Sequence, residues 1–127
     1  MTDGPPGVAE QVTSTVAGWP GVETAPHRFG GIEFRLGRRE LGHLHGDRLA
    51  DIPFPRRVRD ELIAGGRAEA HHILPLSGWI SLPLRGPADV ENAIELFRLS
   101  YDRAQQAQSR REQRLKDEQT PGTEPKV

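Results

Sequence analysis

Residues 37–46 read Gly-Arg-Arg-Glu-Leu-Gly-His-Leu-His-Gly and hold more chemically capable side chains than any other ten positions of the chain. If this block is a strand, successive side chains point to opposite faces of the sheet. One face would then carry Arg39, Leu41, His43 and His45, and the other Arg38, Glu40, Gly42 and Leu44. Polar side chains that face a core are costly unless they are paired. We therefore expect the face with the two histidines to line a pocket.

Two histidines two positions apart on a strand can bind one metal ion from the same side, because histidine is the commonest metal ligand. A third ligand would come from His27, His71 or His72, or from Glu33, Glu40 or Asp51, and would leave an open, catalytic position. The alternative is a set of surface or hydrogen-bonded histidines on a polar sheet face. We expect no cofactor; the alternative is a single metal ion, with His43 and His45 as its candidate ligands.

Two further residues are candidates for a site, and each has a structural alternative. Glu40 lies beside Arg38 and Arg39, so it could act as a general base or hold a substrate, or it could form an ion pair between strands. Trp79 opens an apolar strand after Gly78. It could form the aromatic wall of a pocket, or it could belong to the core.

Composition limits the class of protein. A chain of 127 residues is expected to form one domain. The net charge of −1 gives no general attraction to nucleic acid, and the absence of cysteine excludes disulfides and thiolate catalysis. No apolar run approaches the length of a membrane span, and the N-terminus lacks a signal-peptide pattern. We expect a soluble, cytoplasmic protein with no membrane partner.

The hydrophobic pattern predicts an α+β fold with a mostly antiparallel sheet, in the order α-β-β-β-β-α-β-β-α. The first helix covers residues 8–18, and strands follow at 22–27, 32–36, the central block and 48–54. A second helix begins at Pro55, residues 71–74 form a short strand or loop, and residues 78–84 form a strand. The last helix begins near Pro87 and has a core-facing stripe of Val90, Ala93, Ile94, Phe97 and Tyr101.

The same pattern predicts the domain organisation. Residues 1–7 are expected to be disordered, and residues 8–104 to form the single folded domain. Residues 105–127 contain few large apolar side chains. They are expected to form a charged helical extension, followed by a disordered tail from about Glu118.

Arginine is enriched in the middle of the chain, with nine arginines against six acidic residues from Arg28 to Arg67. Arg56, Arg57 and Arg59 fall on the first turn of the second predicted helix, where they could contact phosphate or an acidic partner. More often such a cluster is a solvated face. This segment supports an alternative function, a non-catalytic module that contacts nucleic acid or a protein.

The central block, the helix after it, Trp79 at the start of an apolar strand, and the helix with Leu99-Ser100-Tyr101 together resemble a known family. The pattern is similar to the luciferase domain of fungal bioluminescence. It is more closely similar to short bacterial proteins of unassigned function that share this domain. The similarity spans roughly residues 27–104.

Fungal luciferases oxygenate a hydroxylated styryl-pyrone with molecular oxygen through a peroxide, without a known added cofactor. The resemblance implies a pocket for a small, aromatic or enolic molecule and an oxygenase activity, in which a histidine takes the substrate's proton. It makes His43, His45 and Glu40 catalytic candidates, and Arg39 and Trp79 substrate-binding candidates, to which we add His72. Compared with the fungal proteins, we expect this protein to lack the long N-terminal region and its apolar anchor, and the segment before Trp79 is shorter. We therefore expect neither the fungal substrate nor light emission.

Overall fold

The structure, a computed structural model, describes residues 7–27 and 30–119. It has an α+β fold with a six-stranded antiparallel sheet and three helices, which confirms the predicted class and order. The segment after the second helix forms a strand only at Glu69–Ala70, and residues 71–74 are loop. The elements are α1 (Val8–Ala17), β1 (Val22–Pro26), β2 (Ile32–Leu36), β3 (Arg39–His45), β4 (Leu49–Pro53), α2 (Arg56–Ala64), β5 (Glu69–Ala70), β6 (Trp79–Pro83) and α3 (Pro87–Gln119).

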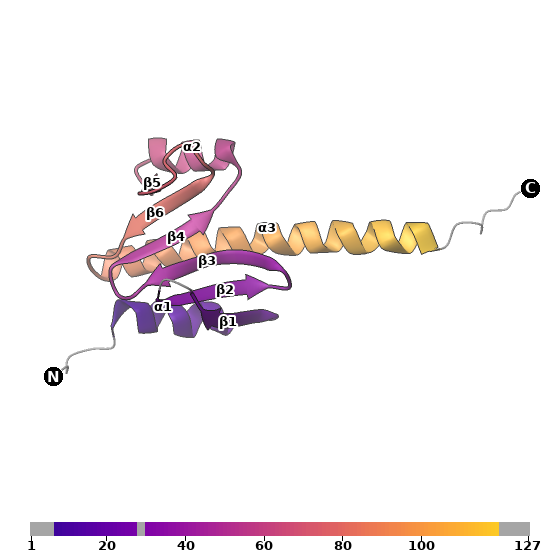
Figure 1. The fold of residues 1–127 in the computed structure, drawn as a ribbon, viewed down its shortest axis with the longest axis horizontal. Helices are drawn as coiled ribbons and strands as arrows, with labels where there is room; N and C mark the ends of the chain where they lie inside the picture. The colour runs from indigo at the N-terminus through magenta and orange to yellow at the C-terminus, as the bar shows by residue number, and fades with distance from the viewer. Residues whose placement is uncertain (1–6, 28–29, 120–127) are drawn as a thin grey trace, which may run out of the picture.

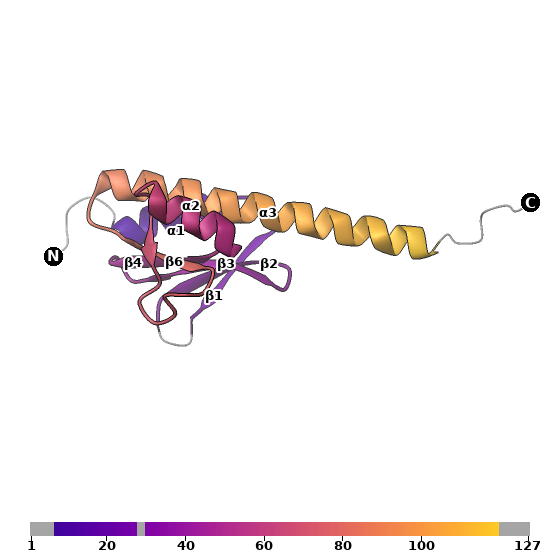
Figure 2. The same ribbon diagram turned by 90° about the horizontal axis from the view of Figure 1, so that it is seen from above.

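The strands lie in the order β1-β2-β3-β4-β6-β5, and every neighbouring pair is antiparallel. Helix α3 runs across the back of the sheet in Figure 1 and contacts α1, β3 and β4. Figure 2 shows α1 and α3 on the same side of the sheet. Among the described residues, no helix covers the opposite face, so that face is available for a site.

The core lies between the sheet and α3. Phe34 of β2 packs edge-to-face on Phe97 of α3, with ring centroids 5.2 Å apart, and both side chains are fully buried. The predicted stripe of α3 faces this core, although Ile94 is only half-buried. Burial of each large apolar side chain contributes about 1.5–3 kcal/mol. This packing fixes the back of the sheet and leaves polar residues for the other side.

The predicted alternation holds from Gly42 to His45, with His43 and His45 on one face, but it was wrong for Glu40 and Leu41, because β3 contains a β-bulge. Phe34 pairs with Gly42 and Arg35 pairs with Glu40, so Leu41 is an extra residue without a partner on β2. The bulge turns Leu41 into the core, where its exposure is 0%. It also turns Glu40 onto the face of His43, since a bulge shifts the side-chain alternation by one position.

Helix α3 supports the bulge directly. Ser100 lies on the buried side of α3, and its hydroxyl donates a hydrogen bond of 2.9 Å to the carbonyl oxygen of Leu41. A bulged residue is left outside the regular ladder, and a buried carbonyl without a partner is costly. The contact therefore stabilises the bulge and ties it to the helix.

Helix α3 continues to Gln119 and projects beyond the sheet (Figure 1). The disordered tail was predicted from about Glu118, but Glu118 and Gln119 are helical. The rest of that tail, and residues 1–6 of the predicted disordered N-terminus, lie outside the described residues. None of the helices in the described part of the chain combines the length and apolar character of a membrane span. The cytoplasmic location stays a prediction.

We expect Gly42→Ala to destabilise the protein by about 3 kcal/mol, since it combines a disfavoured backbone conformation with overpacking. Gly42 has φ 145°, and an added Cβ would lie 2.6 Å from Cε1 of Phe97 and 2.8 Å from the carbonyl oxygen of Asp51. Gly46→Ala is the matched control, because Gly46 also has positive φ (57°) but nothing within 4 Å of the added Cβ. Urea unfolding measures both variants, and equal losses would contradict a tight fit at the bulge.

Candidate functional site

A row of polar side chains crosses the face that the described helices leave open. Strand register places Glu33, His43, Asp51 and Ser81 opposite one another on β2, β3, β4 and β6. Directly paired residues in a sheet point to the same face. His45 and Trp79 lie two positions away on their own strands, so they share this face too.

Asp51 is the centre of the row. Its side chain is completely buried, and its Oδ1 accepts a hydrogen bond of 2.6 Å from the hydroxyl of Ser81. Its Oδ2 faces the Nε2 atoms of four histidines, at distances of 2.8 Å (His45), 3.1 Å (His72), 3.3 Å (His43) and 3.4 Å (His71). A buried carboxylate is tolerated only when it is paired and hydrogen-bonded. Here the histidines supply that pairing.

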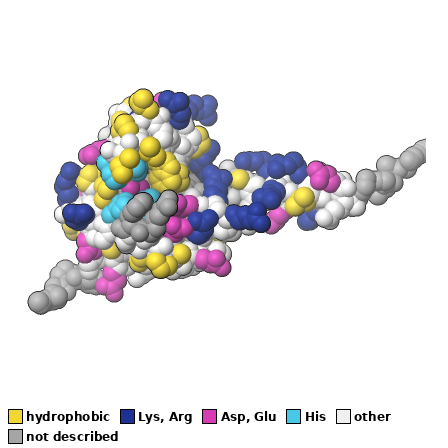
Figure 3. Space-filling view, viewed as in Figure 1, with side chains coloured by type: hydrophobic (Ala, Val, Ile, Leu, Met, Phe, Trp, Pro, Cys, Tyr) yellow, Lys and Arg dark blue, Asp and Glu magenta, His cyan; other side chains and the backbone are white. Residues whose placement is uncertain are grey.

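All five histidines of the chain gather around this carboxylate. His27 stacks on His43 with ring centroids 3.9 Å apart, and His71 stacks on His72 at 4.4 Å. His45 lies between the two pairs, 4.8 Å from His43 and 5.8 Å from His72. Figure 3 shows the histidines on this face of the molecule, with hydrophobic side chains beside them. The histidines come from β3, from the end of β1 and from the loop before β6.

His43 is held from both sides by carboxylates. Its Nδ1 lies 2.6 Å from Oε2 of Glu40, and its Nε2 faces Asp51. Burial by itself would lower the pKa of His43, but the hydrogen bonds to Asp51 and Glu40 outweigh burial and raise the pKa to about 9. With the carboxylates of Glu40 and Asp51 as its hydrogen-bond partners, His43 therefore carries a proton on each ring nitrogen at neutral pH.

The contacts that raise the pKa of His43 lower the pKa of Asp51. Burial would raise the pKa of Asp51, but hydrogen bonds from His43, Ser81, His72 and His45 outweigh burial and hold the pKa well below its ordinary value. The carboxylate is therefore ionised throughout the physiological range.

The tautomer of His71 follows from its backbone contacts. Its Nδ1 accepts hydrogen bonds from the backbone N–H groups of Ile73 (3.1 Å) and Leu74 (3.0 Å). The proton of the neutral ring must then be on Nε2, which faces Asp51. Burial lowers the pKa of His71 despite the nearby carboxylate, so the ring stays neutral. Burial, with a smaller contribution from His43, also lowers the pKa of His27.

An apolar wall borders the histidines. Trp79 is half-buried, with its ring centroid 5.4 Å from that of His43. The loop before it exposes Ile73 (69%), Leu74 (50%) and Leu76 (75%). The two hydrogen bonds to His71 hold the start of this loop. The site thus has a charged, hydrogen-bonding centre and an apolar rim.

The structure brings together five of the six residues that the sequence singles out as catalytic or substrate-binding: His43, His45, Glu40, His72 and Trp79. Arg39 lies apart from them. It lines a groove between the β2–β3 turn and the projecting part of α3, together with Gln108 and Arg111. The structure does not bring its side chain into the histidine cluster.

Sequence reasoning gave too little weight to Asp51, Ser81 and His71. Asp51 and His71 entered only as possible third ligands of a metal ion, and Ser81 was not a candidate. A signal for Asp51 was present, because it stands between Ala50 and Ile52 in an otherwise apolar strand. A charged residue in such a strand is buried with a partner or serves a function.

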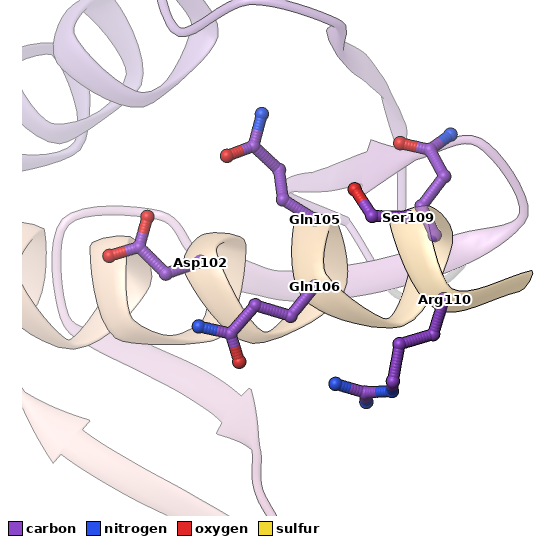
Figure 4. A pocket seen from close by; sticks show the side chains of 6 residues that line it. Asp102, Gln105, Gln106, Ser109 and Arg110 are labelled. Carbon is purple, nitrogen blue, oxygen red and sulfur yellow. The ribbon is translucent and has the colours of Figure 1, made fainter. Parts of the chain in front are cut away.

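Three sets of side chains in the described residues place possible metal-ligating atoms within 4.8 Å of one another. They are His27, Glu40 and His43; His43, His45 and Asp51; and Asp51, His71 and His72. The sets overlap at His43 and Asp51, so they form one continuous cluster. A different hollow lies along α3, where Asp102, Gln105, Gln106, Ser109 and Arg110 point in different directions (Figure 4). It contains no comparable convergence of ionisable groups.

Comparison with known families gives one result. The model of the Luciferase domain family matches residues 38–100. This part of the chain belongs to the Luciferase domain family. The Luciferase domain contains β3, β4, the loop of His71 and His72, β6 and Ser100, and therefore most of the histidine cluster. His27 and Glu33 lie outside the matched residues. No curated protein and no solved structure matches the chain.

We expect the free energy of unfolding of protein treated with a chelator to fall as the pH rises from 6.5 to 9. The folded state keeps a proton on His43 in this window, whereas the unfolded state releases it, so the stabilisation present below pH 6.5 is lost as the pH approaches 9. The loss attributable to this group is on the order of 2 kcal/mol.

Urea unfolding of the native protein and of a His43→Asn variant at several pH values measures this effect. The groups that face His43 are Glu40, Asp51, His27, His45 and Trp79. They remain in the variant, so its profile should be flatter. Parallel profiles would show that the ionisation of His43 is not coupled to folding.

Proposed function

We propose that the Luciferase domain of this chain binds a small, flat molecule with a phenolic or enolic hydroxyl and promotes its reaction with molecular oxygen. The family supports a reaction of this type. The observation that carries the proposal is the cluster of five histidines around Asp51 beside Trp79.

The two parts of the face suit the two parts of such a molecule. A flat ring would lie against Trp79, with the apolar side chains of the 73–76 loop at its edge. Small-molecule sites are mostly apolar with a few convergent polar groups. The hydroxyl would point toward His43 and His45, whose rings lie 4.8 Å apart.

The chemistry begins with removal of the hydroxyl proton. His72 is the most exposed imidazole of the cluster, with 43% of its side chain accessible, so we assign the proton transfer to it. His43 and His45 would stabilise the oxyanion, and Glu40 would hold His43 in position through its Nδ1. Each of these roles depends on a histidine that the buried carboxylate orients.

The resulting enolate or phenolate then reacts with oxygen. A new bond forms between a substrate carbon and one oxygen atom, and the removed proton ends on the other oxygen atom as a hydroperoxide. The substrate is oxidised by two electrons and oxygen is reduced to the peroxide level, so no further reductant is required.

The arginine-rich middle supports the alternative function, a module that contacts nucleic acid or a protein. Arg59 already donates to Asp60 and to the carbonyl oxygen of Pro75. Arg56 and Arg57 are exposed on α2. Salt separates the two functions, because binding through phosphate contacts weakens steeply with ionic strength.

We expect phenols and hydroxypyrones to quench the fluorescence of Trp79 in a Trp19→Phe background. Trp19 lies elsewhere, 5.3 Å from the ring of Tyr101, so its removal leaves a single reporter in the site. Affinity should change less than about threefold when salt is raised from low to physiological levels, whereas phosphate contacts would weaken binding about a hundredfold or more. The bound compounds should also support oxygen uptake at an oxygen electrode.

The matched variants are His72→Asn and Arg57→Ala. His72→Asn should lower oxygen uptake at least about a hundredfold, since it removes the general base, while Arg57→Ala should leave uptake unchanged. Salt-sensitive binding of an oligonucleotide that is lost in Arg57→Ala, with no response to aromatic compounds, would favour the alternative.

A further inference from the structure

More histidines converge on one oxygen atom of Asp51 than hydrogen bonding to a carboxylate requires. Four Nε2 atoms lie within 3.4 Å of Oδ2 of Asp51, while Ser81 already occupies Oδ1. An oxygen atom has only two lone pairs for accepting hydrogen bonds. The arrangement therefore gathers more nitrogen atoms than hydrogen bonding to Oδ2 can use.

We propose that His43, His45 and Asp51 bind one divalent first-row transition-metal ion through Nε2, Nε2 and Oδ2. These three residues form one of the sets whose ligand atoms all lie within 4.8 Å of one another. Two ligand atoms that each lie about 2.1 Å from an ion are about 3 Å apart when they meet it at a right angle. The distances from Oδ2 to the Nε2 atoms of His45 and His43 are 2.8 and 3.3 Å.

The outer contacts prepare these three residues for ligation. Oε2 of Glu40 lies 2.6 Å from Nδ1 of His43 and holds the proton there, which leaves Nε2 as the ligand atom. A carboxylate that receives the second ring nitrogen is the usual support of a metal-binding histidine. Ser81 orients Asp51 in the same way by donating to Oδ1 at 2.6 Å.

The other two sets do not offer three ligands. In the set of Asp51, His71 and His72, Nδ1 of His71 accepts two backbone hydrogen bonds, so Nε2 carries the proton and cannot ligate. In the set of His27, Glu40 and His43, Oε2 of Glu40 and Nδ1 of His43 lie only 2.6 Å apart, well short of the about 3 Å between two ligand atoms that meet an ion at a right angle.

Two histidines and one carboxylate with open positions form the ligand set of non-haem iron(II) oxygenases. The open side here is the solvent side, because the side chain of His45 is 23% accessible and that of His72 beyond it is 43% accessible. The metal site rests on geometry alone, whereas its use in oxygenation rests on the function proposed above. There the ion held by His43 and His45 would bind the substrate oxyanion in place of direct hydrogen bonds from these two imidazoles, and His72 would take the proton.

The test uses Co²⁺ as the probe, with the full chain stripped by a chelator and no organic compound present. We expect one equivalent of Co²⁺ per chain by elemental analysis after gel filtration, with visible absorption bands of a bound ion. His45→Asn should abolish both signals, and His72→Asn should keep them. Glu40→Gln should weaken binding about tenfold or more through loss of the outer contact.

Circular dichroism establishes that each variant is folded. The test uses His45→Asn and Glu40→Gln and needs no variant of Asp51, whose buried carboxylate is the centre of the site. Absence of Co²⁺ from the native protein, or full binding by His45→Asn, would overturn the proposal. Loss of the ion in His72→Asn would overturn the assignment of the three ligands. Bound Co²⁺ without any response to aromatic compounds would uphold the metal site and count against the proposed oxygenase alone.

Discussion

The negative charge of Asp51 is buried in the middle of a β-sheet, and the arrangement around it follows from that cost. An isolated buried carboxylate would be protonated or would unfold its surroundings. Here one hydroxyl and four imidazoles surround the two oxygen atoms. The histidines that compensate the charge are also the groups to which the proposed chemistry is assigned, so stability and the proposed chemistry depend on the same contacts.

The bulge in β3 connects this polar centre to the hydrophobic core on the other side of the sheet. A single extra residue sends Leu41 into the core and brings Glu40 beside His43. Gly42 allows the close approach of Phe97, and Ser100 satisfies the carbonyl of the bulged residue. Changes in helix α3 can therefore reach the histidines through one backbone distortion, although α3 lies on the opposite face.

The geometry of the site also explains why a small domain can hold so many imidazoles together. His43 and His45 belong to strand β3, whereas His71 and His72 lie in a loop that the backbone contacts of His71 hold in place. The strand supplies rigid positions, and the loop supplies the exposed His72 together with an apolar rim. Strand and loop thus meet at one carboxylate, which suits binding of a small molecule at the surface of the sheet.

The sequence by itself determined the order of elements and the core stripe of α3, and it singled out His43, His45, Glu40 and Trp79 as candidate site residues. Those features depend on local periodicity, turn residues and residue type, which are visible in one chain. The face of Glu40 and Leu41 was predicted wrongly, because a bulge depends on the register with β2 and on the contact with Ser100. Only the tertiary structure decided that Asp51, Ser81 and His71 join the site and that Arg39 stays apart. These placements arise from pairing between strands that are distant in the chain, and no local pattern encodes such distances.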